Sequence, residues 1–273
     1  ILIFFALDKD ILAISVSYLK AVSFGMFFYV LFRYLSSYSE GMTLTLPVFA
    51  VVFFGSLINI PLDIIFAFGY WKENKKIVIY SLLVCLLMGF QAWLGKTVVD
   101  SVLSPVKITT HMLTAFLIVA LQLYIIYVVS AKNCVRKYDK KFSKTLVSVL
   151  LLTVIQVILG TSVREFIDTV EKSGAPKSLW LQYPKITFYI HRSFSIVVLL
   201  ANLFLLLRNR NLQLGFEKVT WVIRILIFEI ISGVIMVYVA FPFGSQTIHL
   251  ILATLLFSVQ FYLLLEIKKG TKK

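Results

Sequence analysis

The sequence predicts an all-α, polytopic membrane protein with about eight transmembrane helices. Of its 273 residues, 60% are hydrophobic, and the mean hydropathy is +0.93. Only 15% of the residues are charged, whereas about a quarter are charged in a typical soluble domain. Apolar runs long enough to cross a hydrocarbon core of ~30 Å recur along the chain. We therefore expect a single membrane domain without an attached soluble domain.

Eight apolar runs are candidate membrane spans. The first contains Lys20 near its middle, and the second contains Pro61, which neighbouring helices can accommodate within a membrane. The longest segment between spans on the outer side, about 163–184, ends in Trp180 and Tyr183, whose rings suit a membrane interface. The expected spans are 11–32, 42–69, 77–95, 107–130, 144–162, 185–207, 219–241 and 246–265.

The distribution of basic residues predicts the orientation of the spans. Seventeen Lys and Arg residues lie before the first span, in every second loop and after the last span, whereas seven lie in the remaining loops. Cytoplasmic loops carry the excess of positive charge in membrane proteins. We therefore expect a multi-pass protein of the cell inner (cytoplasmic) membrane with both termini in the cytoplasm. Because the net charge of +14 resides in short loops between spans, we do not expect nucleic-acid binding.

The sequence contains an internal repeat with an offset of 138 residues. Residues 90–95 align with residues 228–233, and at the same offset His111 aligns with His249. This pattern predicts two four-helix bundles related by duplication and running in the same sense across the membrane. The N-terminal half would comprise 1–131 and the C-terminal half 132–273.

The three histidines of the chain all lie in expected spans. His111, His191 and His249 each follow the outer end of a span by a few residues, which places each imidazole about 6–9 Å below that end. An ionisable group within a membrane is costly and usually functional. A neutral imidazole bonded to a neighbouring helix would explain any one of them. Three at one depth, two of them at equivalent positions of the repeat, predict ligands.

Heme iron is the metal that best suits these histidines. Zinc normally takes three or four protein donors, and we expect no acidic or cysteine side chain at that depth to complete such a set. A heme iron needs only two facing imidazoles, because the porphyrin supplies the other four nitrogens. The interior of a helix bundle is also a common place for such a cofactor.

Several of these segments resemble the heme A synthase family, in the form common in Bacteroidetes-like bacteria. The resemblance covers roughly 53–266, and the first ~50 residues show none. Residues 89–95 and 111–115 resemble the third and fourth helices of that family, 156–165 the fifth, 191–195 the sixth and 249–253 the eighth.

The resemblance implies a membrane enzyme that oxidises a methyl group of heme O to the formyl group of heme A, for cytochrome oxidase assembly. It implies that heme b is the cofactor and that His191 and His249 bind its iron in the C-terminal half. It further implies that heme O is the substrate and that His111 is one of its ligands in the N-terminal half. The bilayer, a heme O synthase and an electron donor are the implied partners.

The second expected span departs from the pattern of that family. The His-Arg pair of the family would fall at Val51 and Val52, and its glutamate would fall at Val48. The catalytic residues are therefore not assigned. A non-enzymatic b-type membrane heme protein that keeps His191 and His249 is the first alternative function. A transporter is the second, although it would need polar, discontinuous helices in the middle of the membrane.

Two arginines lie near the expected level of the heme. Arg164 stands at the outer end of the fifth span, and Arg192 follows His191 directly. A guanidinium group pairs well with carboxylates, so both residues are candidates for binding heme propionates. The alternative for Arg164 is extension of its side chain to the membrane interface. The alternative for Arg192 is that its guanidinium group pairs with a carbonyl group.

Overall fold

The computed structural model describes residues 71–72, 74–100, 105–129 and 137–270. The first two expected spans, 11–32 and 42–69, lie outside these residues, as do Val48, Val51 and Val52. Residues Leu83–Val128 and Asn133–Lys273 belong to one compact unit, whereas the beginning of the first described helix belongs to another. The contacts given below all lie within the first of these units.

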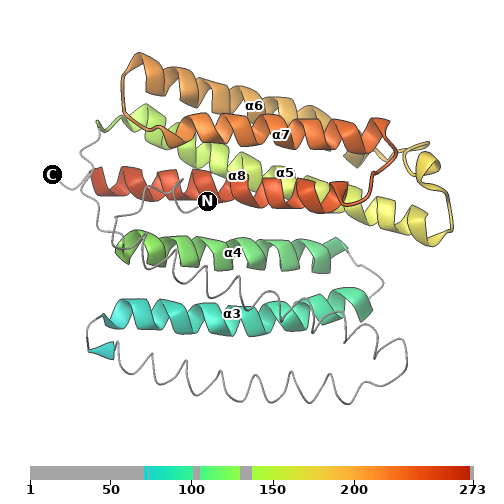
Figure 1. The fold of residues 1–273 in the computed structure, drawn as a ribbon, viewed down its shortest axis with the longest axis horizontal. Helices are drawn as coiled ribbons and strands as arrows, with labels where there is room; N and C mark the ends of the chain where they lie inside the picture. Colours follow the sequence, from blue (N-terminus) through green and yellow to red (C-terminus); the bar gives the residue numbers. More distant parts are fainter. Residues whose placement is uncertain (1–70, 73, 101–104, 130–136, 271–273) are drawn as a thin grey trace. The chain divides into compact units, whose positions relative to one another are not determined.

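Six of the described helices are long and apolar enough to cross a membrane. None of the described residues forms a β-strand. The all-α membrane class is therefore confirmed, whereas eight spans and two repeat-related bundles, divided at 131/132, stay predictions. The helices are α3 (Lys75–Asp100), α4 (Pro105–Val129), α5 (Lys140–Lys172), α6 (Ile186–Asn211), α7 (Lys218–Tyr238) and α8 (Ser245–Gly270) (Figure 1).

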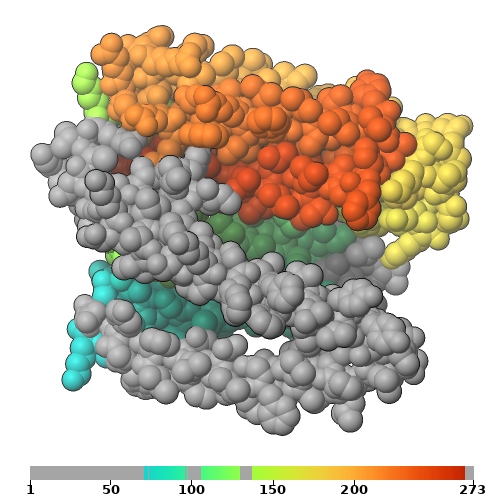
Figure 2. Space-filling view, viewed as in Figure 1, coloured from blue at the N-terminus to red at the C-terminus, as the bar shows by residue number. Residues whose placement is uncertain are grey.

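Helices α5 to α8 form a four-helix bundle. α5 packs against α6 and α8, and α7 packs against the same two helices, so α6 and α8 lie diagonally opposite each other. α7 and α8 are neighbours in this bundle, and Figure 2 shows their side chains in contact. Most of the buried side chains are apolar, and large apolar side chains such as Leu151, Leu200 and Phe228 are also exposed on the outside. Such an exposed apolar surface is what lipid requires of a spanning helix.

Helix α4 packs on this bundle through α5 and α8. The hydroxyl oxygens of Thr109 and Thr161 lie 2.7 Å apart, which joins α4 to α5. The rings of Phe116 and Phe257 stack at a centroid distance of 4.4 Å, which joins α4 to α8. These contacts hold α4 in one register against the bundle.

Helix α5 extends ten residues beyond the expected end at 162. No glycine or proline interrupts the chain before Gly174, whose φ of +79° ends the helix in the left-handed region. Phe166 and Ile167 on the added turns pack against Trp180 and Phe241. Part of the expected outer loop is therefore helical, because these turns bury apolar side chains.

Trp180 is buried, whereas an interfacial position was expected from the sequence. Its side chain is 4% exposed, and its indole N–H donates to the Ala175 carbonyl at 2.9 Å. Its ring lies 5.2 Å from that of Phe241, which belongs to the connection between α7 and α8. Tyr183, by contrast, is 82% exposed. Trp180 therefore contributes to a small apolar core that covers this end of the bundle.

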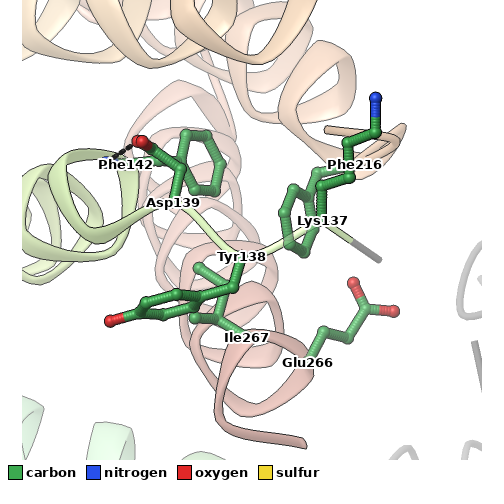
Figure 3. A pocket seen from close by; sticks show the side chains of 7 residues that line it. All are labelled: Lys137, Tyr138, Asp139, Phe142, Phe216, Glu266 and Ile267. Carbon is green, nitrogen blue, oxygen red and sulfur yellow. Dashed lines mark hydrogen bonds between the residues drawn. The ribbon is translucent and has the colours of Figure 1, made fainter. Parts of the chain in front are cut away.

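The opposite end of the bundle is held by two ion pairs. Asp139 caps α5 by accepting from the Phe142 backbone N–H at 2.6 Å, as Figure 3 shows, and it also accepts from Arg208 of α6. Both guanidinium contacts are short, at 2.6 and 2.8 Å. Lys218 of α7 pairs with Glu266 of α8 at 2.8 Å. Each pair joins two neighbouring helices where they leave the apolar layer.

Replacement of Asp139 by Asn and by Ala separates the charge pair from the helix cap. Hydrogen bonding from the Arg208 guanidinium holds the pKa of Asp139 below its ordinary value. A lowered pKa in the folded state means that the stabilisation is complete above about pH 4 and is lost as pH falls through the lower, folded-state value. We expect Tm at pH 7 to fall from wild type to Asp139→Asn and further to Asp139→Ala, the lost cap costing about 1 kcal/mol.

Thermal unfolding in detergent micelles measures the order of these three Tm values. The difference between wild type and Asp139→Asn should shrink as the pH is lowered below about 4, because protonation removes the same charge. Equal Tm values for these two proteins at pH 7 would show that the charge pair does not stabilise the bundle.

Candidate functional site

The structure brings His191 of α6 and His249 of α8 together across the bundle. Their ring centroids lie 6.5 Å apart, and the ring planes are inclined by 71°. Both residues stand in the first two turns of their helices. Because α6 and α8 are diagonally opposite, the two imidazoles approach each other through the interior of the bundle.

Each of the three histidine rings lies against a glycine of the preceding helix. Only at Gly160 does the ring lie closer than an ordinary contact to the position that a Cβ atom would take. A Cβ atom built at the glycine would lie 3.4 Å from Cε1 of His111 at Gly95, 3.2 Å from Cε1 of His191 at Gly160, and 3.6 Å from Cε1 of His249 at Gly233.

A polar side chain precedes each of these glycines by four residues, on the same face of its helix. Gln91 Nε2 lies 3.2 Å from His111 Nε2. Gln156 Nε2 donates to the backbone carbonyl of His191 at 3.0 Å. Glu229 Oε1 lies 3.3 Å from His249 Nε2. The pattern Gln/Glu, three residues, Gly therefore recurs in α3, α5 and α7, each time against a histidine.

Sequence reasoning missed this threefold pattern, although its spacing is visible in the sequence. The repeat at an offset of 138 residues related α3 to α7 and left out Gln156 and Gly160 of α5. The expectation that no acidic side chain lies at the depth of the histidines is wrong, because Glu229 contacts His249. Reading each span separately does not show which side chains of neighbouring antiparallel helices meet.

The contacts of His249 form a chain that leads back to α7. Ser232 Oγ lies 2.7 Å from His249 Nδ1 and donates to the backbone carbonyl of Glu229 at 2.8 Å. The second carboxylate oxygen of Glu229, Oε2, is buried without a hydrogen-bond partner among the described residues. His249 therefore has a polar contact at each ring nitrogen.

The pair of His191 and His249 fits the iron of a heme. An iron about 2 Å from one nitrogen of each ring would separate the two centroids by roughly 6 Å, close to the 6.5 Å observed. His191 Nδ1 is buried and has no hydrogen-bond partner among the described residues. Within the described ranges, no group of three or more His, Cys, Asp or Glu side chains could hold a metal ion. A heme needs only the two imidazoles.

His111 lies in a separate setting, between Gln91 and Gly95 of α3. Its Nδ1 is buried and has no partner in the part of the chain that the structure describes. The second expected span, in which the His-Arg pair of the resembling family would fall at Val51 and Val52, lies outside that part. The role of His111 toward a substrate heme therefore stays a prediction.

The two candidate arginines contact other groups. Arg164 Nη2 pairs with Asp168 Oδ1 at 2.7 Å, one turn further along α5. Arg192 is exposed, and its Cζ lies 5.5 Å from the ring centroid of Tyr189 and 5.9 Å from that of Phe188. Binding of heme propionates by either residue stays a prediction.

Comparison with curated proteins gives matches over a short segment. The chain is 46% identical over 55 residues to the multidrug resistance protein NorM of Vibrio cholerae and 44% identical over 55 residues to that of Vibrio parahaemolyticus. It is 37% identical over 62 residues to the probable NorM of Idiomarina loihiensis. These segments cover 20% to 23% of this chain. The chain spans about an eighth of the length of these relatives, so they do not define its function.

A family comparison covers far more of the chain. The family described as cytochrome oxidase assembly protein, COX15-CtaA, matches residues 33–261. The match begins about twenty residues before the point at which the resemblance was recognised in the sequence, and it includes all three histidines. The chain is a multi-pass membrane protein that belongs to the cytochrome oxidase assembly protein family, the family of heme A synthase.

Proposed function

We propose that this chain is a divergent heme A synthase that holds heme b between α6 and α8. The pairing of His191 and His249 at 6.5 Å carries the proposal, because it occurs in a member of the cytochrome oxidase assembly family. The family supports a role in heme A synthesis. The reaction itself, the oxidation of a heme O methyl group to formyl, belongs to the proposal.

The chain contributes binding and orientation to this chemistry. Heme b, when bound, supplies electron transfer through its iron. His191 and His249 would bind its iron, and Gly160 leaves room for the His191 ring between closely packed helices. His111, held by Gln91, is the candidate ligand for the heme O substrate.

The reaction balances with dioxygen as the oxidant and an external electron donor. Each of two successive hydroxylations of the methyl carbon consumes one dioxygen, two electrons and two protons, and each releases one water. The resulting geminal diol loses a third water to give the formyl group. The electron donor and a heme O synthase are therefore proposed partners. We also propose that the protein lies in the cell inner membrane with both termini in the cytoplasm, in accord with the charge distribution.

The alternatives receive less support. A non-enzymatic b-type heme protein would need only the His191/His249 pair, whereas the family match also extends through His111 and α3. A transporter would be suggested by the NorM relatives alone, and the matching segment is 12% to 13% of their length. We therefore propose synthesis of heme A rather than heme storage or transport.

The first test concerns the axial ligands. The purified protein should show the six-coordinate, low-spin absorption spectrum of a b-type heme, since two imidazoles would bind its iron. We expect His191→Ala and His249→Ala each to abolish this spectrum. The matched control is His111→Ala, which should retain it. An unchanged low-spin spectrum in both of the first two variants would refute the ligand assignment.

The second test concerns the reaction. Because Val48, Val51 and Val52 stand where the family has its glutamate and His-Arg pair, we expect low heme A yields from this chain. The triple variant Val48→Glu, Val51→His, Val52→Arg should raise the yield on the order of tenfold or more, since a positioned acid or base contributes at least that much.

The measurement is extraction of heme from cells that make heme O and have no heme A synthase of their own. Cells without the chain provide the blank. Absence of heme A from both proteins would favour the non-enzymatic alternative. Equally abundant heme A from both would show that the three positions are dispensable.

The third test compares two glycines of the site. A Cβ atom at Gly160 would lie 3.2 Å from the His191 ring, which is closer than an ordinary contact, whereas one at Gly233 would lie at a normal 3.6 Å from His249. Overpacking of this kind costs about 1–3 kcal/mol, so Gly160→Ala should retain heme roughly five- to 150-fold less tightly. Gly233→Ala serves as the control and should change retention much less. Heme loss to an excess of apomyoglobin measures both, and equal retention would contradict the proposed crowding.

A further inference from the structure

We propose that Ser232 of α7 is a positioning residue that fixes His249 with its proton on Nδ1, so that Nε2 is the nitrogen offered to a heme iron. This inference rests on the proposed function. Ser232 would contact His249, the proposed iron ligand, and not the iron itself.

The assignment follows from counting hydrogens on the Ser232 hydroxyl. A serine hydroxyl has one hydrogen to donate and lone pairs to accept with. Ser232 donates that hydrogen to the backbone carbonyl of Glu229, three residues earlier in α7, at 2.8 Å. While it makes that bond, the same oxygen, 2.7 Å from His249 Nδ1, is free to accept there. An iron on Nε2 would leave the hydrogen of a neutral imidazole on Nδ1, which is the arrangement that this acceptor favours.

A neutral imidazole with its hydrogen on Nδ1 keeps its lone pair on Nε2. Glu229 Oε1 lies 3.3 Å from that nitrogen, so an iron that binds Nε2 would have to displace this carboxyl group. Ser232 is 8% exposed, so water does not compete for its hydroxyl. The hydrogen-bonded chain from His249 through Ser232 to the α7 backbone is thus complete within the protein.

The other two histidines lack this chain. The residue directly before the contacting glycine is Ser232 in α7, but it is Leu94 in α3 and Leu159 in α5. Accordingly, Nδ1 of His111 and Nδ1 of His191 are buried without a hydrogen-bond partner in the described part of the chain. The two proposed iron ligands therefore differ, because Nδ1 has a hydrogen-bond partner in His249 and none among the described residues in His191.

A hydrogen bond of this kind changes the ligand in two ways. It fixes the tautomer and the orientation of the ring, and it makes the ring a more basic, more electron-donating ligand. Stronger donation stabilises the ferric state, so it lowers the reduction potential of the heme. Loss of such a contact typically weakens metal binding about 10–100-fold.

The test uses the full-length protein in detergent with heme bound. We expect Ser232→Ala to lose heme to apomyoglobin on the order of ten times more readily and to raise the midpoint potential. Ser232→Thr keeps the hydroxyl and should restore both properties toward wild type. Ser258→Ala is the matched control, because Ser258 is 7% exposed and donates to a backbone carbonyl of its own helix at 2.6 Å. It should leave both properties unchanged.

The electron paramagnetic resonance spectrum of the ferric heme provides a third readout, since it responds to the orientation and basicity of the axial imidazoles. Unchanged potential, g-values and heme retention in Ser232→Ala would overturn the inference while leaving the proposed function intact. Retention of the low-spin spectrum by His249→Ala would overturn the ligand assignment itself. If Ser232→Ala does not fold, Ser232→Cys replaces it. A thiol is a weak acceptor, so the same loss relative to Ser232→Thr is expected, and equality of the two would contradict the role.

Discussion

The interior of the bundle is organised by the need to satisfy imidazole rings in an apolar medium. A polar ring within a span requires a hydrogen bond or a metal, because lipid supplies neither. The structure meets this need by placing a glycine and a Gln or Glu side chain of the preceding helix against each histidine. Helix spacing, ring position and polar contacts are therefore set together, and a change at one of them affects the others.

The ends of the bundle keep this arrangement in register. Asp139 and Arg208 join α5 to α6, and Lys218 and Glu266 join α7 to α8. At the other end, Lys177 Nζ donates to the backbone carbonyl of Phe241, in the connection between α7 and α8, at 3.2 Å. Hydrophobic burial alone does not fix the register of helices surrounded by lipid, since lipid tails are as apolar as the side chains. Directional contacts at both ends are therefore needed to bring His191 opposite His249.

Much of this architecture could be predicted from the sequence, and the parts that could not have physical reasons. The expected span 107–130 closely matches α4, and the order of the helices follows from hydropathy alone. The end of α5 was placed too early, because Phe166 and Ile167 are stabilised by the distant residue Trp180. The contact between Glu229 and His249 depends on how two antiparallel helices align, which a single span does not reveal.

The surroundings of His249 and His111 differ, and this difference bears on the two heme sites that we propose. His249 is bonded at Nδ1 through Ser232, whereas His111 is contacted at Nε2 by the Gln91 amide nitrogen and has no partner at Nδ1 among the described residues. An amide N–H that donates to Nε2 occupies the lone pair that an iron would use. An iron at His111 Nε2 would therefore have to displace Gln91, and an iron at His249 Nε2 would have to displace Glu229 Oε1, which lies 3.3 Å away. The two histidines differ at Nδ1, where the Ser232 hydroxyl lies against the proposed heme b ligand and His111 has no such contact among the described residues.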